Sequence, residues 1–391
     1  MPNAPLSRRD FSRVAVAAVA TGALPQALRG SATPSSRPAS RGAPSPWPGY
    51  DDAIVIDMLA TPGPFNVPDW LKGPLTPAMI ENARRSGITA VNSTVSATGD
   101  AGIAFEATVA NIASWEYELQ RSPGVFTKIR TVADIRRAKA ERKLGAILGF
   151  QDTTPIGDRP ERLEMFYRFG VRIVQLTYNG PNLVGDGCLV PKDGGLKPYG
   201  RDLVARMNEL GILVDISHTG WETTRQAIAA SRRPIAATHS GAAAVTNVPR
   251  NKPDDVLRAL ADKGGVVGVF MMPFLRERGQ PTADDFVRHV THCVNVCGED
   301  HVGVGSDNSI TPLDLTPEFR KVHADFVEAR RKAGISAPGE DANVFNYVPD
   351  FNSPRRMERV ADALAGAGHP ASRIEKILGG NWMRLLGEVW R

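Results

Sequence analysis

The sequence contains little cysteine, only three residues in a chain of 391. Cys188 stands alone in an expected loop, and Cys293 and Cys297 lie four residues apart in an expected helix. That spacing is a poor geometry for an unstrained disulfide bond. A fold held together by disulfides is therefore excluded, and we expect three buried, unreactive thiols.

A strongly basic surface and a nucleotide-binding motif are also missing. No Lys/Arg-rich stretch interleaved with aromatic residues occurs, which leaves nucleic-acid binding without support. Three of the five net positive charges fall in residues 1–31, so the rest of the chain is close to neutral. No Gly-x-Gly-x-x-Gly follows the first expected strand, which argues against a dinucleotide-binding protein. What is present, 42% hydrophobic and 23% charged residues, is typical of a globular enzyme with a large core.

The N-terminal segment reads SRRDFSRVAVAAVATGALPQA, with a twin-arginine pair, Arg8 and Arg9, before an Ala/Val run. The run is too short and too rich in alanine for a membrane span. We interpret residues 1–31 as a twin-arginine export signal, with a disordered basic leader as the alternative. The signal predicts a periplasmic protein without stable membrane insertion after cleavage. The Ser/Pro-rich residues 32–50 are expected to form a flexible linker before one domain at 51–391.

From residue 53 onward, apolar runs of strand length alternate with amphipathic runs of helix length. Near-continuous apolar strands joined by helices favour parallel pairing with both faces of the sheet covered. We therefore predict an α/β fold, an eight-stranded (β/α)8 TIM barrel, with an open doubly wound sheet as the alternative. The expected strands cover residues 53–57, 88–94, 144–150, 171–178, 212–218, 234–239, 265–271 and 301–307.

Polar side chains stand at the carboxyl ends of most of these strands, where such barrels carry their reactive groups. His218 and His239 end two successive strands, and neutral imidazoles suit zinc or a similar divalent ion. One strand-end histidine is more often a hydrogen-bonded core residue, but two of them with Asp307 favour a metal or catalytic site. These residues alone predict a metal-assisted hydrolase. The complete set is Asp57, Gln151, Asp152, Tyr178, Asn179, His218, His239 and Asp307.

Five stretches, in this order, carry a resemblance to a known family: GVRIVQLTYNGPNLVGDGC, LVDISHTG, PIAATHSGAAAVTNVPRN, HVGVGSDN and GGNWMRLL. From about residue 53 to its end, the chain resembles the membrane (renal) dipeptidases, peptidase M19 type, which are zinc-dependent barrels of the amidohydrolase type. The resemblance implies hydrolysis of the peptide bond of dipeptides or similar amides by a metal-activated water. It also implies a small peptide-like substrate and a homodimer.

The resemblance assigns a role to each matching residue. His218 and His239 correspond to the two histidines that hold one of the family's two zinc ions. Arg250, in a Pro-Arg-Asn context, would receive the terminal carboxylate of the substrate, which a guanidinium fork suits. Asp307, in Gly-Ser-Asp, would handle the proton of the water and of the new amine. Tyr178 replaces an oxyanion-stabilising histidine and would donate a hydrogen bond to the substrate.

The ligands of the other zinc ion are replaced. Leu59 and Thr61 stand where the family carries His-x-Asp, and Gln151 stands in place of the bridging glutamate. A neutral glutamine is a weak zinc ligand and cannot hold two dications close together. We therefore expect one zinc ion or none, held by His218, His239 and, weakly, by Gln151.

Three functions remain open. The first is a metal-dependent dipeptidase-like hydrolase with a mononuclear site, in which Asp57 or Asp152 is an alternative ligand or a structural carboxylate. The second is an altered or inactive dipeptidase-like periplasmic protein that acts in binding or in peptide or siderophore maturation. The third is lyase or isomerase chemistry with Asp307 or His239 as acid–base. We rank the hydrolase first.

Overall fold

The computed structural model describes residues 47–65, 73–98 and 101–390. The expected export signal, residues 1–31, and most of the expected linker, residues 32–50, lie outside the described residues. The side chains of Trp47 and Tyr50 are buried, and the Tyr50 hydroxyl donates to the backbone carbonyl of Ser86 at 2.8 Å. The last residues of the expected linker segment are therefore packed into the domain.

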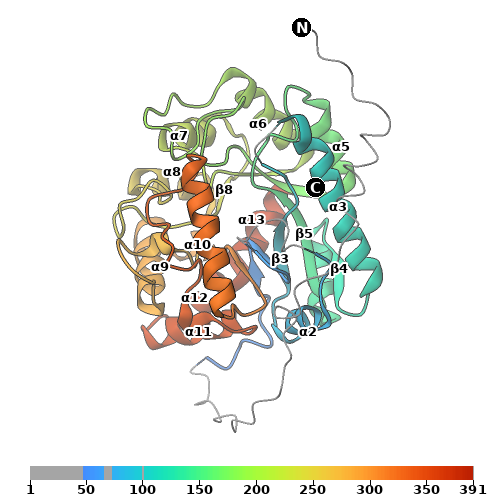
Figure 1. The fold of residues 1–391 in the computed structure, drawn as a ribbon, viewed down its shortest axis with the longest axis vertical. Coiled ribbons are helices and arrows are strands. Elements are labelled where there is room, and N and C mark those ends of the chain that lie inside the picture. The colour runs from blue at the N-terminus through green and yellow to red at the C-terminus, as the bar shows by residue number, and fades with distance from the viewer. Residues whose placement is uncertain (1–46, 66–72, 99–100, 391) are drawn as a thin grey trace. The chain divides into compact units, whose positions relative to one another are not determined.

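Parallel strands run around the centre of the domain in the order in which they occur along the chain (Figure 1). All eight strands expected from the sequence are present; β5 has the expected bounds, and the other seven are shortened or shifted by a few residues. They are β1 Ile56–Asp57, β3 Ala90–Thr94, β5 Leu144–Phe150, β6 Val171–Gln175, β7 Leu213–Asp215, β8 Ala236–Ser240, β9 Val266–Val269 and β10 Val302–Val304. Three short strands were not expected: β4 Phe126–Lys128, which pairs with β5, and β2 Ala60–Thr61, which pairs with β11 Asn308–Ser309.

The sheet closes between β1 and β10. The Met58 amide donates to the Val304 carbonyl at 3.0 Å, one residue beyond the end of β1. Asp57 seals the same junction, because its carboxylate accepts from the Ser306 amide at 2.7 Å and from the Ser306 hydroxyl at 2.6 Å. The predicted (β/α)8 barrel is confirmed, and the open-sheet alternative is wrong.

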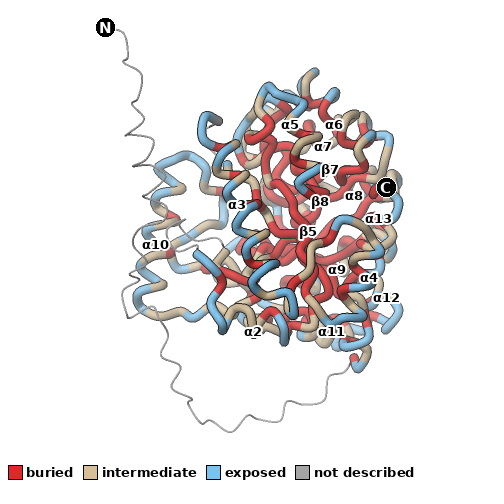
Figure 2. The backbone as a smooth tube through the Cα atoms, turned by 90° about the vertical axis from the view of Figure 1, so that its right-hand side faces the viewer, coloured by how far each residue is buried: buried red, intermediate tan, exposed pale blue. Residues whose placement is uncertain are grey.

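Helices cover the outside of the barrel, with their buried faces on the strands (Figure 2). Gly170 and Gly211, which end α5 and α6, adopt left-handed backbone angles (φ of 104° and 74°) just before the next strand. The helices are α2 Pro77–Arg85, α3 Ala101–Arg121, α4 Val132–Ala140, α5 Glu161–Phe169, α6 Pro198–Leu210, α7 Trp221–Ala230, α8 Asp254–Asp262, α9 Ala283–Cys297, α10 Pro317–Lys332, α11 Arg356–Gly366, α12 Ala371–Glu375 and α13 Asn381–Val389.

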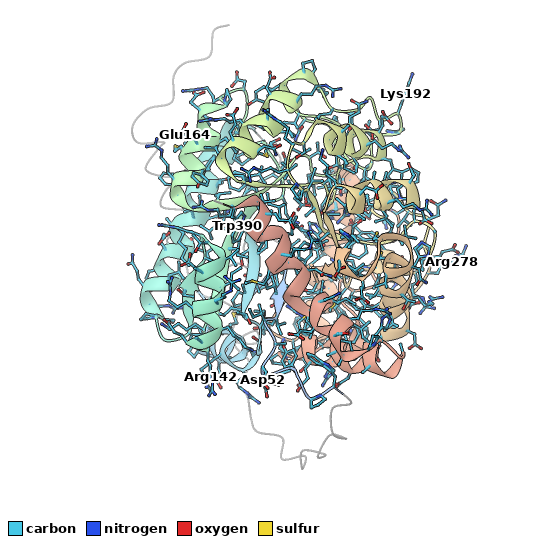
Figure 3. The ribbon with its side chains drawn as sticks, turned by 180° about the vertical axis from the view of Figure 1, so that it is seen from behind. Asp52, Arg142, Glu164, Lys192, Arg278 and Trp390 are labelled. Atoms are coloured by element: carbon cyan, nitrogen blue, oxygen red, sulfur yellow. The ribbon has the colours of Figure 1, made fainter. Side chains whose placement is uncertain are left out.

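The C-terminal helix α13 packs across the face of the domain that is turned toward the viewer in Figure 3. Its Trp382 is fully buried with inward residues of β1, β3, β5 and β6, and Nε1 donates to the Val304 carbonyl at 3.2 Å. A Cβ atom on Gly303 would lie 2.4 Å from that nitrogen, so this position requires glycine. The GGNWMRLL motif therefore plugs the barrel and leaves the other end for a site.

Helix α10 lies on the opposite face of the domain from α13 and crosses in front of the strands in Figure 1. We call residues 317–348, which comprise α10 and the loop after it, the lid. In the described part of the chain, no helix has the length and hydropathy needed to span a bilayer.

Candidate active site

His218 and His239 come together at the carboxyl ends of neighbouring strands. His239 lies within β8, and His218 follows β7 by three residues. Their ring centroids are 5.1 Å apart with the planes inclined by 61°, and both side chains are buried. The tertiary structure thus makes one pair of two residues that lie 21 positions apart in the chain.

Each imidazole is held by a hydrogen bond at Nδ1. His218 Nδ1 lies 2.6 Å from Asn179 Oδ1, and its Nε2 is buried without a hydrogen-bond partner. His239 Nδ1 lies 2.8 Å from the Thr238 hydroxyl, which itself donates to Asp215 at 2.6 Å. An oxygen partner at Nδ1 leaves Nε2 as the free lone pair, the arrangement typical of metal-binding histidines.

Burial, helped by nearby cations, keeps both imidazoles neutral. Burial, with the nearby cation Arg250, holds the pKa of His218 and of His239 well below the ordinary value of 6.5. Burial also raises the pKa of Asp215, while hydrogen bonds from Ser217 and Thr238 act in the opposite direction. Neutral imidazole is the form that binds a metal ion, so both histidines have the protonation state needed for metal binding at neutral pH.

Arg250 is buried in the same region and has a vacant donor group. Its Nη1 donates to the Ser217 carbonyl at 2.7 Å, whereas Nη2 is buried without a hydrogen-bond partner. The guanidinium carbon lies 5.6 Å from the ring centroid of Phe270 and 5.8 Å from that of Phe274. A buried guanidinium with an unused N–H group between aromatic rings is well suited to bind a carboxylate.

Asp307 follows β10 and has an unusual backbone conformation, with a φ of 60°. Its amide donates to the Leu59 carbonyl at 2.8 Å, which fixes the turn that bears it. Aspartate tolerates the left-handed region better than most residues, and such conformations gather at functional sites. The structure therefore holds this carboxylate at the pocket by a contact with the backbone of Leu59, the residue that replaces an expected metal ligand.

One pocket unites most of the predicted site residues. His239 is not among its lining residues but contacts His218, with 5.1 Å between the ring centroids. The lining residues are Tyr178, Asn179, His218, Arg250, Met272, Phe274, Asp307, Phe326, Arg330, Glu340 and Asn346.

The lid supplies pocket residues that were not predicted from the sequence. Arg330 contacts the Tyr178 hydroxyl and makes a paired bond to Glu340, with Nε and Nη2 donating at 2.7 and 2.9 Å. Phe326 and Asn346 complete the lid's part of the lining. Their segment follows the last barrel strand and carries no pattern that relates it to a strand end, so only its tertiary placement identifies it.

The replaced positions are also placed by the structure. Gln151 reaches His239, with 3.4 Å between the two Nε2 atoms. Leu59 is buried, and Thr61 forms part of β2, so neither offers a side chain comparable to the family's ligands. Among the described residues, no group of three or more His, Cys, Asp or Glu side chains is arranged to hold a metal ion.

The two carboxylates considered as alternative ligands, Asp57 and Asp152, have structural partners instead. Asp57 accepts from Ser306 and lies 3.5 Å from Arg356 Nε. Asp152 accepts from the Thr154 amide and hydroxyl at 2.8 Å, which is a turn-capping arrangement. Among the described residues, neither carboxylate therefore forms, with the histidine pair, a group arranged to hold a metal ion. The three cysteines are free and buried, as expected.

The closed parallel barrel, with polar side chains gathered at the carboxyl end of its strands, is of the amidohydrolase-like type. The sequence profile of the membrane dipeptidases, peptidase family M19, matches residues 77–317. The chain therefore belongs to the membrane dipeptidase family, as the sequence motifs predicted.

Individual relatives agree with this placement. Dipeptidase verJ of Clonostachys rogersoniana is 36% identical over 243 residues, which cover 60% of this chain and 60% of that protein. An uncharacterized protein from the pqqA 5′ region of Klebsiella pneumoniae is 30% identical over 70% of this chain and 92% of its own length. The crystal structure of an amidohydrolase from Pseudomonas aeruginosa is 33% identical, with a TM-score of 0.74, over 87% of this chain and 98% of that one.

Proposed function

We propose that this protein is a dipeptidase-type hydrolase that uses one metal position instead of two. The observation that carries the proposal is a pair of buried, unpartnered atoms beside the same pocket, His218 Nε2 and Arg250 Nη2. Leaving such groups unsatisfied costs free energy, so their retention points to ligands that complete them. One is suited to a cation and the other to a carboxylate.

The histidine pair would hold the ion, for which we propose zinc, with the side chain of Gln151 next to His239 as a weak third donor. A divalent ion at this position would polarise an amide carbonyl and lower the pKa of a water molecule. Substrate binding, proton transfer and oxyanion stabilisation would be carried out by side chains of the protein.

Three side chains around the pocket have distinct roles in the proposed reaction. Arg250 would bind the terminal carboxylate of a dipeptide through Nη2 and so fix the position of its peptide bond. Asp307 would take the proton of the attacking water and pass it to the leaving amine. Tyr178 would donate its hydroxyl proton to the developing oxyanion in a hydrogen bond, since burial raises its pKa and keeps it protonated.

A second candidate is a binding protein that has lost hydrolysis. Two histidines and a glutamine are fewer and weaker ligands than the three that catalytic zinc ordinarily has. This observation favours a dipeptidase-like protein that retains Arg250 for a peptide-like ligand and acts in binding or in peptide or siderophore maturation. The two candidates make opposite predictions for turnover.

Metal analysis combined with a dipeptide screen separates them. The hydrolase should contain about one equivalent of zinc and cleave dipeptides, and both properties should be lost in His218→Ala. Less than about 0.1 equivalents of metal, with no turnover after zinc is added, contradicts the hydrolase. Ligand binding that is weakened in Arg250→Ala under those conditions supports the binding protein.

The proposed setting is the periplasm, reached by the twin-arginine route through residues 1–31, with the chain acting as a homodimer. Cell fractionation of the wild type and of a variant with Arg8 and Arg9 replaced by lysine tests the export. Sedimentation of the purified chain tests the dimer.

A further inference from the structure

Asn179 connects the lid to His218 through two different atoms of one side chain. Its Oδ1 lies 2.6 Å from His218 Nδ1, and its Nδ2 donates to the Ile335 carbonyl in the lid at 3.0 Å. The residue is 1% exposed, so water does not compete for either contact. Ile335 lies 156 positions further along the chain, and the contact exists only because the lid covers this end of the barrel.

The chemistry of the two contacts fixes which way the amide points. A backbone carbonyl can only accept a hydrogen bond, so the Ile335 carbonyl must face the NH₂ group of Asn179. The oxygen Oδ1 then faces His218, and because it also only accepts, His218 Nδ1 must carry the proton. The lone pair of this imidazole is consequently on Nε2, the atom that is buried without a partner.

A third, weaker contact acts in the same direction. The Cys188 thiol donates to Asn179 Oδ1 at 3.4 Å, which again requires the oxygen on the His218 side of the amide. Among the described residues, Asn179 Nδ2 has no second acceptor besides the Ile335 carbonyl. The Ile335 carbonyl therefore determines the orientation of the amide.

We propose that Asn179 is a positioning residue that couples closure of the lid to the tautomer and orientation of His218. With the lid closed, the amide is held in one orientation and the Nε2 lone pair of His218 is presented to the pocket. With the lid open, the amide loses its nitrogen-side partner and the imidazole is no longer held in this state. The use of Nε2 as a ligand rests on the proposed function, whereas the coupling does not.

The same closure brings in the other lid groups. Arg330 reaches the Tyr178 hydroxyl only from α10, and its bond to Glu340 lies within the lid. Tyr178 and Asn179 are consecutive residues after β6, so one loop receives both lid contacts. The site is thus complete only when the lid is in place, which would keep the hydrolytic groups inactive until a substrate is enclosed.

Two variants of Asn179 separate its two contacts. Asn179→Asp keeps an acceptor for His218 Nδ1 but has no donor for the Ile335 carbonyl. Asn179→Leu has a similar volume and loses both contacts. Cys188→Ala is the matched control, because it removes only the weak thiol contact. Thermal unfolding of the full chain confirms that each variant is folded before it is compared.

The readouts need neither metal nor substrate. Trypsin cleavage after the exposed residues Arg331 and Lys332 reports opening of the lid, and imidazole ¹⁵N NMR of the metal-free chain reports the His218 tautomer, assigned with His218→Gln. We expect cleavage to be about fivefold faster in both Asn179 variants, the effect of one lost hydrogen bond. The Nδ1–H tautomer should persist in Asn179→Asp and be lost in Asn179→Leu.

Other outcomes overturn the coupling. Unchanged cleavage in both Asn179 variants would show that Asn179 does not hold the lid, and an Nε2–H tautomer in the wild type would show that it does not orient His218. An Nδ1–H tautomer that persists in Asn179→Leu would show that the Asn179 oxygen does not set the tautomer of His218. If the wild type contains no zinc and shows no turnover, only the proposed function is contradicted. The coupling is unaffected, because neither trypsin cleavage nor the NMR measurement depends on metal or substrate.

Discussion

Tyr178 lies flat against His218, with ring centroids 4.3 Å apart and the planes inclined by 22°. The stack places a phenol hydroxyl beside an imidazole whose Nε2 is unpartnered. Because burial raises the pKa of Tyr178, the hydroxyl stays protonated at neutral pH and can act as a donor. The two side chains therefore offer a hydrogen-bond donor and a lone pair to the same pocket.

Tyr178→Phe tests the donor without removing the stack. We expect kcat for dipeptide hydrolysis to fall about 100-fold with KM nearly unchanged, because an oxyanion donor acts mainly in the transition state. The melting temperature should stay close to that of the wild type. An unchanged kcat would rule out this role.

Arg250→Met removes the vacant guanidinium donor while filling much of its volume. For a dipeptide with a free carboxylate, kcat/KM should fall about 100-fold, since a charge-assisted hydrogen bond is lost from a buried position. The same dipeptide with an amidated C-terminus is the control, and the variant should cleave it as slowly as the wild type does. Equal losses on both substrates would contradict carboxylate binding by Arg250.

Gln151→Glu replaces a weak neutral donor next to His239 with a carboxylate. Zinc affinity should rise about tenfold, measured by competition with a chelator, because a charged oxygen ligand is added. The stoichiometry should remain one ion per chain, since Leu59 and Thr61 still supply no comparable ligands. Binding of two ions by this single variant would show that the first-strand residues are not what limits the site.

Glu340→Gln weakens the bond that holds Arg330 in the lid. The pair is largely buried, so losing the carboxylate should destabilise the lid and speed trypsin cleavage within it about tenfold. Glu328→Gln is the matched control, because Glu328 pairs with Arg331 on the exposed side of the same helix and should change cleavage less than about twofold. Similar rates in the two variants would contradict a special role for the Glu340 pair.

Lys252 makes stability depend on pH. It is fully buried, its Nζ donates to the Thr219 carbonyl at 2.6 Å, and burial lowers its pKa from 10.5 to about 7. Between these values the unfolded chain binds a proton that the folded chain has released, so this residue makes folding more favourable as pH rises from about 7 towards 10.5.

Urea unfolding at pH 7 and pH 9 measures this effect. Relative to Lys252→Met, the wild type should gain about 2 kcal/mol of unfolding free energy between the two values. The difference between the proteins removes the contribution of other groups, such as the buried cysteines and tyrosines. A difference that is independent of pH would show that Lys252 stays charged in the folded protein.

Most of the barrel was predictable because its signals are local. A buried parallel strand such as β5 is a continuous apolar run, and glycines such as Gly170 and Gly211 mark helix ends. The short strands β2, β4 and β11 were missed because two or three residues carry no periodic pattern. Their pairing depends on neighbours elsewhere in the barrel.

The site was predictable in its strand-end residues and not in its lid. Tyr178, His218 and Asp307 line one pocket because the carboxyl ends of parallel strands converge in a closed barrel. Arg250, which the family resemblance predicted, lines the same pocket from the loop after β8. No local pattern marks Arg330 or Glu340 as pocket residues, since their helix follows the last barrel strand.

By itself, the sequence determined the barrel, the family and the loss of one set of metal ligands, because residue identity and order are enough for each. Only the tertiary structure decided that Asp57 closes the barrel with Ser306 and Arg356 instead of facing a metal ion. It also decided that the Ile335 carbonyl sets the orientation of Asn179 and thereby of His218. Apart from the Asn179–His218 contact, which spans 39 positions, these contacts join residues roughly 150 to 300 positions apart. Their energies depend on burial and direction, which no linear pattern records.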